Sequence, residues 1–206
     1  MARVRNHGDV PAPWSDVTSL SLMWDESIGA VPPLGSDLRT ALPQRWVRFH
    51  YLPDSERIPA TAAQRHEVLR RYREVLRALD AGAEEQLLVT TCGWGRSTPA
   101  PRPTDLADLL PGTHWRDVPP GSSDDLAVSV YATSVSADVD DPALGEFLLV
   151  WAADNRTVDA IIAPPSCAWL FHPYDGGMDV IARDPAERDR IAERFTEWLS
   201  PRADGL

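Results

Sequence analysis

The densest set of titratable side chains lies between residues 172 and 179, around two consecutive glycines. His172, Tyr174, Asp175 and Asp179 bring together an imidazole, a phenol and two carboxyl groups. General acid–base catalysis needs a base of this kind beside a polar partner in a cleft. A small hydrolase would use His172 as the base and an acid such as Asp175 to orient it. The simpler interpretation is structural, because Asp commonly fixes a turn by hydrogen bonds from its side chain to the backbone.

Nucleophilic and metal chemistry find less support in the residue spacing. Cys92 and Cys167 are the only cysteines, and two thiols without a local motif are typical of buried, inert side chains in a reduced compartment. A metal site would have to collect His50, His114 and His172 from distant elements, since these residues lack a local ligand spacing. We therefore predict neither a metal nor a cofactor.

An arginine stripe is a candidate for binding rather than catalysis. Arg70, Arg73 and Arg77 share one face of a predicted helix, and such a stripe would suit an acidic partner or a phosphate. The alternative is a solvated face held by ion pairs four residues apart. The available pairs are Glu67 with Arg71 and Arg70 with Glu74.

Two tryptophans form a second candidate binding set. Trp94 and Trp115 lie in or beside predicted loops, where no core periodicity requires them. Exposed aromatic side chains often line binding surfaces, and the alternative is that both indoles pin long connectors to the body of the domain. The glycine-rich turn around Trp94 follows a strand, as phosphate-binding loops do, but it lacks their glycine spacing and their lysine. The turn therefore gives little support to a phosphate loop.

Charge is distributed unevenly along the 206 residues. Residues 1–80 hold 11 Arg and 10 acidic residues, a net charge of +1, whereas residues 81–206 hold 9 Arg and 21 acidic residues, a net charge of −12. Nucleic-acid binding relies on clustered basic side chains, so this acidic part argues against such a partner. An acidic surface would attract a basic protein, although solubility alone also explains it. Without a secretory signal or an apolar run long enough for a bilayer, we expect a soluble cytoplasmic protein with no membrane partner.

Periodicity marks the strands that would position these side chains. Residues 1–36 carry scattered prolines and glycines and predict an irregular arm. Alternation predicts strands at 44–52 and 126–135, and apolar runs predict a central strand at 85–92 and another at 157–163. A helix between the strands at 126–135 and 157–163 would be compatible with a parallel crossover.

Capping residues and turn residues mark the remaining elements. Thr61 and Gln64 form a capping box before a helix that ends near Gly82, and Asp-Pro pairs open further helices at Asp141 and Asp184. Residues 167–182 predict a β-hairpin, because the Asp-Gly-Gly sequence at 175–177 tolerates the positive φ values that tight turns need.

The hairpin also carries a family resemblance. The motif Tyr174-Asp175-Gly176-Gly177-Met178-Asp179-Val180-Ile181, followed by a helix that bears Trp198, resembles the C-terminal part of an uncharacterised bacterial family, one of the domains of unknown function. In that family an early Arg-Phe strand, a helix and an apolar strand precede such a hairpin. The corresponding segments here are Arg48-Phe49, the helix from Thr61 and Leu87-Leu88-Val89, over about residues 40–200. Gly176 departs from the family, which often has a polar residue before an Arg there. The resemblance implies the fold and no activity.

Together these features predict one α+β domain over residues 37–200, with the irregular arm at 1–36 and a short tail at 201–206. The domain would hold a mixed sheet of about five or six strands and three main helices. For function, the sequence favours a cytoplasmic, non-enzymatic protein that binds another protein through its acidic surface. The small hydrolase built around His172 and Asp175 remains the alternative.

Overall fold

One antiparallel sheet of seven strands organises the chain. The computed structural model describes residues 14, 16–53, 56–119, 126–157 and 159–200, and its strand order is β1-β7-β6-β5-β2-β4-β3. The strands are β1 (Trp46–His50), β2 (Gln86–Gly95), β3 (Thr113–Val118), β4 (Ala127–Ser136), β5 (Ile161–Ala163), β6 (Leu170–Tyr174) and β7 (Gly177–Ile181).

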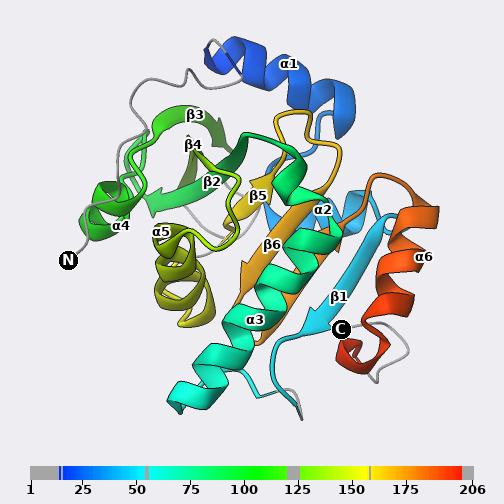
Figure 1. Cartoon of the computed structure of the whole chain (residues 1–206). Helices are drawn as coiled ribbons and strands as arrows, with labels where there is room; N and C mark the ends of the chain where they lie inside the picture. Colours follow the sequence, from blue (N-terminus) through cyan, green and yellow to red (C-terminus); the bar gives the residue numbers. More distant parts are fainter. Residues whose placement is uncertain (1–13, 15, 54–55, 120–125, 158, 201–206) are drawn as a thin grey trace.

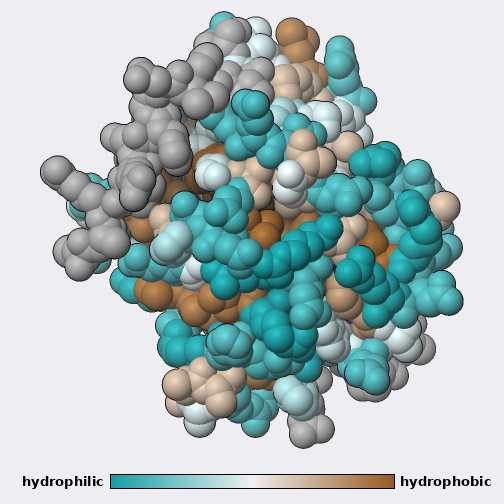
Figure 2. All heavy atoms as spheres, viewed as in Figure 1, coloured by the Kyte–Doolittle hydropathy of each residue, from teal (hydrophilic) through white to brown (hydrophobic). Residues whose placement is uncertain are grey.

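Helices cover both faces of this sheet. They are α1 (Val17–Ser27), α2 (Gly35–Ala41), α3 (Ala62–Ala78), α4 (Thr104–Leu109), α5 (Pro142–Glu146) and α6 (Pro185–Arg194), with α5 continuing as the π-helical segment η3 (Phe147–Ala153). The short turns η2 (Ala81–Ala83) and η4 (Thr196–Trp198) follow α3 and α6. Figure 1 shows α3 across one face of the sheet, with α5 and α6 on either side of it. Figure 2 shows that the side chains over this helical layer are largely hydrophilic, with apolar ones visible between them.

Two apolar cores lie on the two faces because successive strand residues point to opposite sides. On one face, buried residues of α3 and η3 such as Tyr72 and Phe147 pack with strand residues such as Phe49. On the other face, α1 packs Leu20 and Trp24 against a different set of strand residues. We call these the α3 core and the α1 core.

The most strongly patterned predictions are confirmed. The capping box of α3 forms, with the Gln64 backbone N–H donating to Thr61 Oγ1 at 3.2 Å. Strand β2 is paired on both sides, to β4 and β5, as expected for a central strand. The hairpin β6–β7 turns at Asp175 and Gly176, where Gly176 has a φ of 95°.

Three predictions about the architecture are corrected. Residues 17–27 are helical and not irregular, because Asp16 and Ser19 form a reciprocal cap and packing against the sheet stabilises the helix. The described sheet is antiparallel and not mixed, because each described strand pairing is antiparallel. β4 and β5 both run antiparallel to β2, which lies between them, so they run parallel to each other, as the expected crossover requires, without being paired. It has seven strands, and six α-helices are described in place of three main ones.

The predicted arm is described only in part, and the predicted tail is not described. Residues 1–13 and 15 of the predicted arm and the predicted tail at 201–206 lie outside the described residues. Among the described helices, none combines the length and the apolar character that a membrane crossing requires.

Candidate functional site

Three strands bring the sequence-predicted residues onto the face of the α1 core. Register places Asp179 of β7 directly between Arg48 of β1 and His172 of β6. The strands approach closely here, since a Cβ on Gly177 would overlap the backbone carbonyl of Phe49. The result is a cross-strand row of guanidinium, carboxylate and imidazole.

The carboxylate of Asp179 is buried and fully engaged. It is 5% exposed and accepts hydrogen bonds from Arg48 Nε at 2.9 Å and from the Tyr174 hydroxyl at 2.9 Å. Arg39 of α2 lies 4.0 Å from its other oxygen. Burial, reinforced by this carboxylate, raises the pKa of Tyr174 well above its usual value. The phenol therefore stays protonated and remains a donor to Asp179.

An aromatic and arginine stack closes the outer side of this network. The Arg48 guanidinium lies 5.7 Å from the Trp46 ring centroid and 5.3 Å from that of Tyr174. The Arg39 guanidinium lies over the same Trp46 ring, 5.9 Å from its centroid. Such cation–π contacts hold the guanidinium groups in place as the carboxylate does. The network thus joins α2, β1 and the hairpin.

His172 lies beside this network without a hydrogen-bonded acid. Its Nδ1 is buried and has no partner among the described residues, and its ring packs so closely on Gly35 that a Cβ there would overlap it. Burial lowers the pKa of His172, with Asp179 and Asp159 opposing the shift. The neighbouring Asp159 carboxylate accepts a hydrogen bond from the Gly35 backbone N–H at 2.8 Å. The imidazole is therefore held in its neutral form.

The Asp175 carboxylate forms an ion pair with Arg57, outside this network. This carboxylate accepts a hydrogen bond from Arg57 at 2.6 Å, and the Arg57 side chain is 72% exposed. The structure therefore brings Tyr174 and Asp179 together and places His172 next to them, whereas Asp175 pairs at the tip of the hairpin. A base without an orienting acid has only part of what acid–base catalysis requires.

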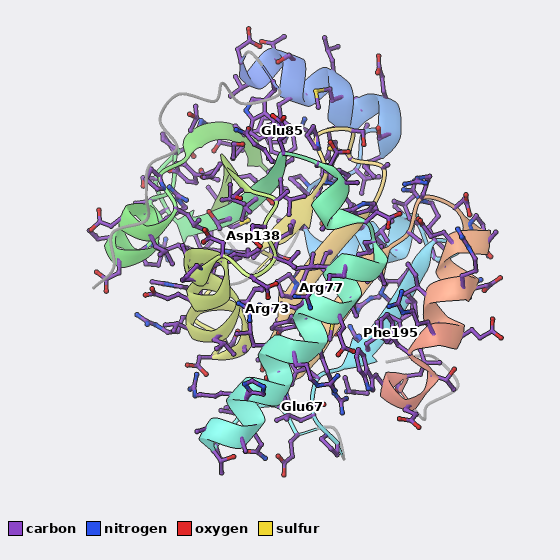
Figure 3. All side chains as sticks on the ribbon, in the orientation of Figure 1. Glu67, Arg73, Arg77, Glu85, Asp138 and Phe195 are labelled. Carbon is purple, nitrogen blue, oxygen red and sulfur yellow. The ribbon has the colours of Figure 1, made fainter. Side chains whose placement is uncertain are left out.

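The arginine stripe of α3 is engaged within the chain. Arg70 bonds Glu67 at 2.7 Å and Glu74 at 2.5 Å, so one expected ion pair four residues apart is present, and the Glu67–Arg71 pair also forms. Hydrogen bonds from Arg70 are the largest influence on Glu67 and lower its pKa to about 2. Arg73 and Arg77, labelled in Figure 3, both reach Asp140. These contacts leave less of the stripe free for a partner.

The two tryptophans have different environments. Trp115 is 6% exposed, meets Trp24 edge to face at 5.4 Å and donates to Ser21 Oγ at 3.0 Å, so it pins α1 to the sheet. Trp94 is 45% exposed and lines a pocket together with Arg102 and Arg156. Neither arginine belongs to a motif or a periodic pattern in the sequence. Their only signal was their position in the loops after β2 and η3.

The two thiols are buried, and two of the histidines lie on opposite edge strands of the sheet. Cys92 and Cys167 are buried and unpaired, and burial raises the pKa of both thiols, to about 12 for Cys167. His50 on β1 and His114 on β3 occupy opposite edges of the sheet. Across the described ranges, no three His, Cys, Asp or Glu side chains are grouped as a metal site.

Comparison with known proteins identifies the family of this chain. No curated protein and no solved structure matches the chain. A family model described as a domain of unknown function (DUF3885) matches residues 34–203, a range that begins after α1 and includes all seven strands and every candidate residue named above. The chain therefore belongs to the DUF3885 family of domains of unknown function.

Proposed function

We propose that this protein acts without catalysis, by binding a basic partner protein through a cluster of carboxylates at one end of the sheet. Four exposed residues define this acidic end: Asp80, Glu84, Glu85 and Asp138. They belong to the part of the chain where α3 ends and β2 begins, and to the loop that follows β4. Figure 3 labels Glu85 and Asp138 beside the end of α3.

Backbone hydrogen bonds keep these segments together. The Ala83 N–H donates to the Asp80 carbonyl at 3.0 Å, which folds Glu84 back toward Asp80, and the Ala137 N–H donates to the Glu85 carbonyl at 3.2 Å. Asp138 therefore lies next to the start of β2. The acidic end is held by secondary structure and needs no partner to assemble.

No basic side chain in the described ranges forms an ion pair with these four carboxylates. The neighbouring arginines of α3, Arg73 and Arg77, contact Asp140. Exposed carboxylates without a basic partner attract a basic surface and steer it during encounter. This unpaired acidic end is the observation that carries the proposal.

A small hydrolase remains the alternative, with weaker support. His172 keeps a buried Nδ1 without a partner, which is the feature that favours it. Its two candidate acids are occupied, because Asp175 pairs with Arg57 and Asp179 pairs with Arg48. A cytoplasmic location accords with the two free thiols, since a reduced compartment keeps such pairs apart.

Affinity capture with matched variants tests the binding proposal. The full chain is immobilised and exposed to native lysate at low salt, beside a variant with Asp80→Asn, Glu84→Gln, Glu85→Gln and Asp138→Asn. The control variant removes four other exposed acids: Glu26→Gln, Asp108→Asn, Glu193→Gln and Glu197→Gln. Both variants change the net charge by the same amount, so they separate a local site from general acidity.

The expected result is a basic protein that the wild type and the control retain and that the acidic-end variant loses. Raising the salt to about 0.5 M should release it, because screening weakens exposed charge pairs. Specific retention that survives in the acidic-end variant would contradict the proposal, as would a wild type that retains nothing specific at low salt. For the hydrolase, any activity found in a substrate screen that His172→Ala leaves unchanged removes that site.

A further inference from the structure

A pocket of about 390 Å³ opens where β2 ends. Its volume falls within the range of small-molecule sites. One wall is Cys92 and Trp94 of β2, a second is the proline-rich segment 101–103, and the third is the loop 155–157 after η3. None of these eight lining residues is acidic, although the chain as a whole has a net charge of −11.

The proline-rich wall is fixed to the sheet. The Ala100 N–H donates to Ser129 Oγ at 2.7 Å, and its carbonyl accepts from the Tyr131 hydroxyl at 2.9 Å. Gly93 permits this approach, because a Cβ there would overlap the Ala100 carbonyl. Segment 101–103 therefore has a defined position before any ligand arrives, which lowers the entropic cost of binding.

The opposite loop is fixed to the end of η3. Asn155 turns the chain with a φ of 54°, and the N–H groups of Arg156 and Thr157 both donate to the Trp151 carbonyl, at 2.8 and 3.1 Å. The Arg156 guanidinium lies 4.3 Å from the Trp151 ring centroid. Loop 155–157 thus presents its side chains from a braced backbone.

Two guanidinium groups give the pocket its charge. Arg102 uses Nη1 to bond Thr91 Oγ1 at 2.8 Å and the Leu110 carbonyl at 3.0 Å, and its other nitrogens have no hydrogen-bond partner in the described ranges. Arg156 is exposed and has no ion pair there either. Burial lowers the pKa of Arg102, and an anion would offset this cost of burying its charge. Of the acids that flank this loop, Asp154 is paired with Arg65 at 2.9 Å, and Asp159 accepts a hydrogen bond from the Gly35 backbone N–H at 2.8 Å.

An aromatic ring and polar groups complete the pocket. Trp94 offers an indole that is 45% exposed, Asn155 contributes an exposed amide, and Thr157 contributes a buried hydroxyl without a described partner. Two guanidiniums match the double charge of a phosphate monoester, and an exposed indole stacks on planar rings. We propose that this pocket binds a small phosphate monoester that carries a planar ring, of the size of a nucleoside monophosphate.

Calorimetric titration of the full chain with AMP tests this assignment. Adenosine supplies the ring without the charge, and inorganic phosphate supplies the charge without the ring. We expect AMP to bind with a Kd below about 1 mM, and to bind at least about tenfold more tightly than either fragment. Arg156→Gln and Trp94→Ala should each weaken AMP binding by about tenfold. Both side chains are exposed, so their replacement should leave the fold intact.

Arg96→Gln is the matched control. Arg96 is an exposed arginine between β2 and the proline-rich segment 101–103, and it does not line the pocket. It should change the Kd less than about twofold. Absence of AMP binding at about 5 mM would overturn the assignment. Equal binding of phosphate and AMP would overturn the role of the ring, and equal loss in all three variants would show that binding reflects general charge and not this pocket.

Discussion

Asp179→Asn should destabilise the protein strongly, although Asp179 lies within the cluster that first suggests catalysis. The change is nearly isosteric and removes the charge that Arg48 Nε contacts at 2.9 Å. Removing one partner of a buried ion pair typically costs about 3–5 kcal/mol. The side chains of Asp179 and Arg48 are 6% and 16% exposed, and Tyr174 can still donate to an amide oxygen. We therefore expect the lower end, about 3 kcal/mol, or about two powers of ten in the folding equilibrium.

Asp175→Asn provides the matched control within the same hairpin. Its partner Arg57 has a side chain that is 72% exposed, and exposed ion pairs contribute less than about 1 kcal/mol. Urea unfolding followed by tryptophan fluorescence gives both free energies, provided the two variants keep the wild-type m-value. Adding Arg48→Met to each protein completes a double-mutant cycle, in which only Asp179 should show a large coupling energy.

An Asp179→Asn variant no less stable than Asp175→Asn would refute this reasoning. Such a result would mean that the buried carboxylate is held at an energetic cost, as strained functional groups are. The cluster of His172, Tyr174 and Asp179 would then again be a candidate active site. A stable Asp179→Asn protein would therefore be more informative about function than an unstable one.

Three further predictions concern single contacts. Gly35→Ala should cost about 1–3 kcal/mol because its Cβ overlaps the His172 ring, and His172→Ala in the same protein should recover part of that loss in thermal unfolding. Glu67, with its pKa lowered to about 2 in the folded chain, should stabilise the protein above pH 4.5 and lose this contribution as pH falls toward 2. Since Glu67 is partly solvated, Glu67→Gln should cost only about 1 kcal/mol at pH 7, and this cost, measured as a difference in free energy of unfolding, should disappear as pH falls through about 2. Cys92 and Cys167 should react with a disulfide reagent at pH 8 about a thousandfold more slowly in the folded protein than in denaturant, because burial raises both thiol pKa values.

Elements with a strong local signal could be predicted from the sequence. Helix α3 has both a capping box and a continuous apolar stripe, and the hairpin has turn residues that allow few geometries. Helix α1 lacks such signals, because its cap uses Ser19 in place of Glu or Gln and only Leu20 and Trp24 are buried. Its stability comes from the sheet beneath it, which a local pattern does not reveal.

Strand β5 shows the same limit at a smaller scale. An apolar run predicted a strand from residue 157, but pairing begins at Ile161. Asn155 and Asp159 have positive φ values, which an extended strand does not accommodate. Asp159 then caps a distant helix start through the Gly35 N–H. Local composition predicted the element, and contacts from remote parts of the chain determined where it starts.

In the candidate site, too, contacts within one hairpin could be predicted from the sequence, whereas contacts between distant strands could not. Tyr174 and Asp179 lie five residues apart in one hairpin, so their hydrogen bond follows from hairpin geometry. Arg48 reaches the same carboxylate only because β1 pairs with β7, and strand order is not encoded in local periodicity. Judged from the hairpin sequence alone, Asp179 is an acid without a basic partner. With Arg48 in place, its most direct role is to join the first strand to the hairpin.

The two proposed binding regions carry opposite charges: carboxylates at the acidic end and two arginines in the pocket. Their responses to salt should therefore differ. A partner at the acidic end is held by exposed charges, whose attraction is largely screened beyond a Debye length of about 10 Å at 0.1 M salt. In the pocket, Arg102 and Arg156 would contact an anion directly, while the surrounding net charge of −11 repels it from a distance. Salt screens that distant repulsion more than it screens direct contacts. Protein capture should therefore weaken steeply as salt rises while AMP binding changes little, so neither interaction can be mistaken for the other.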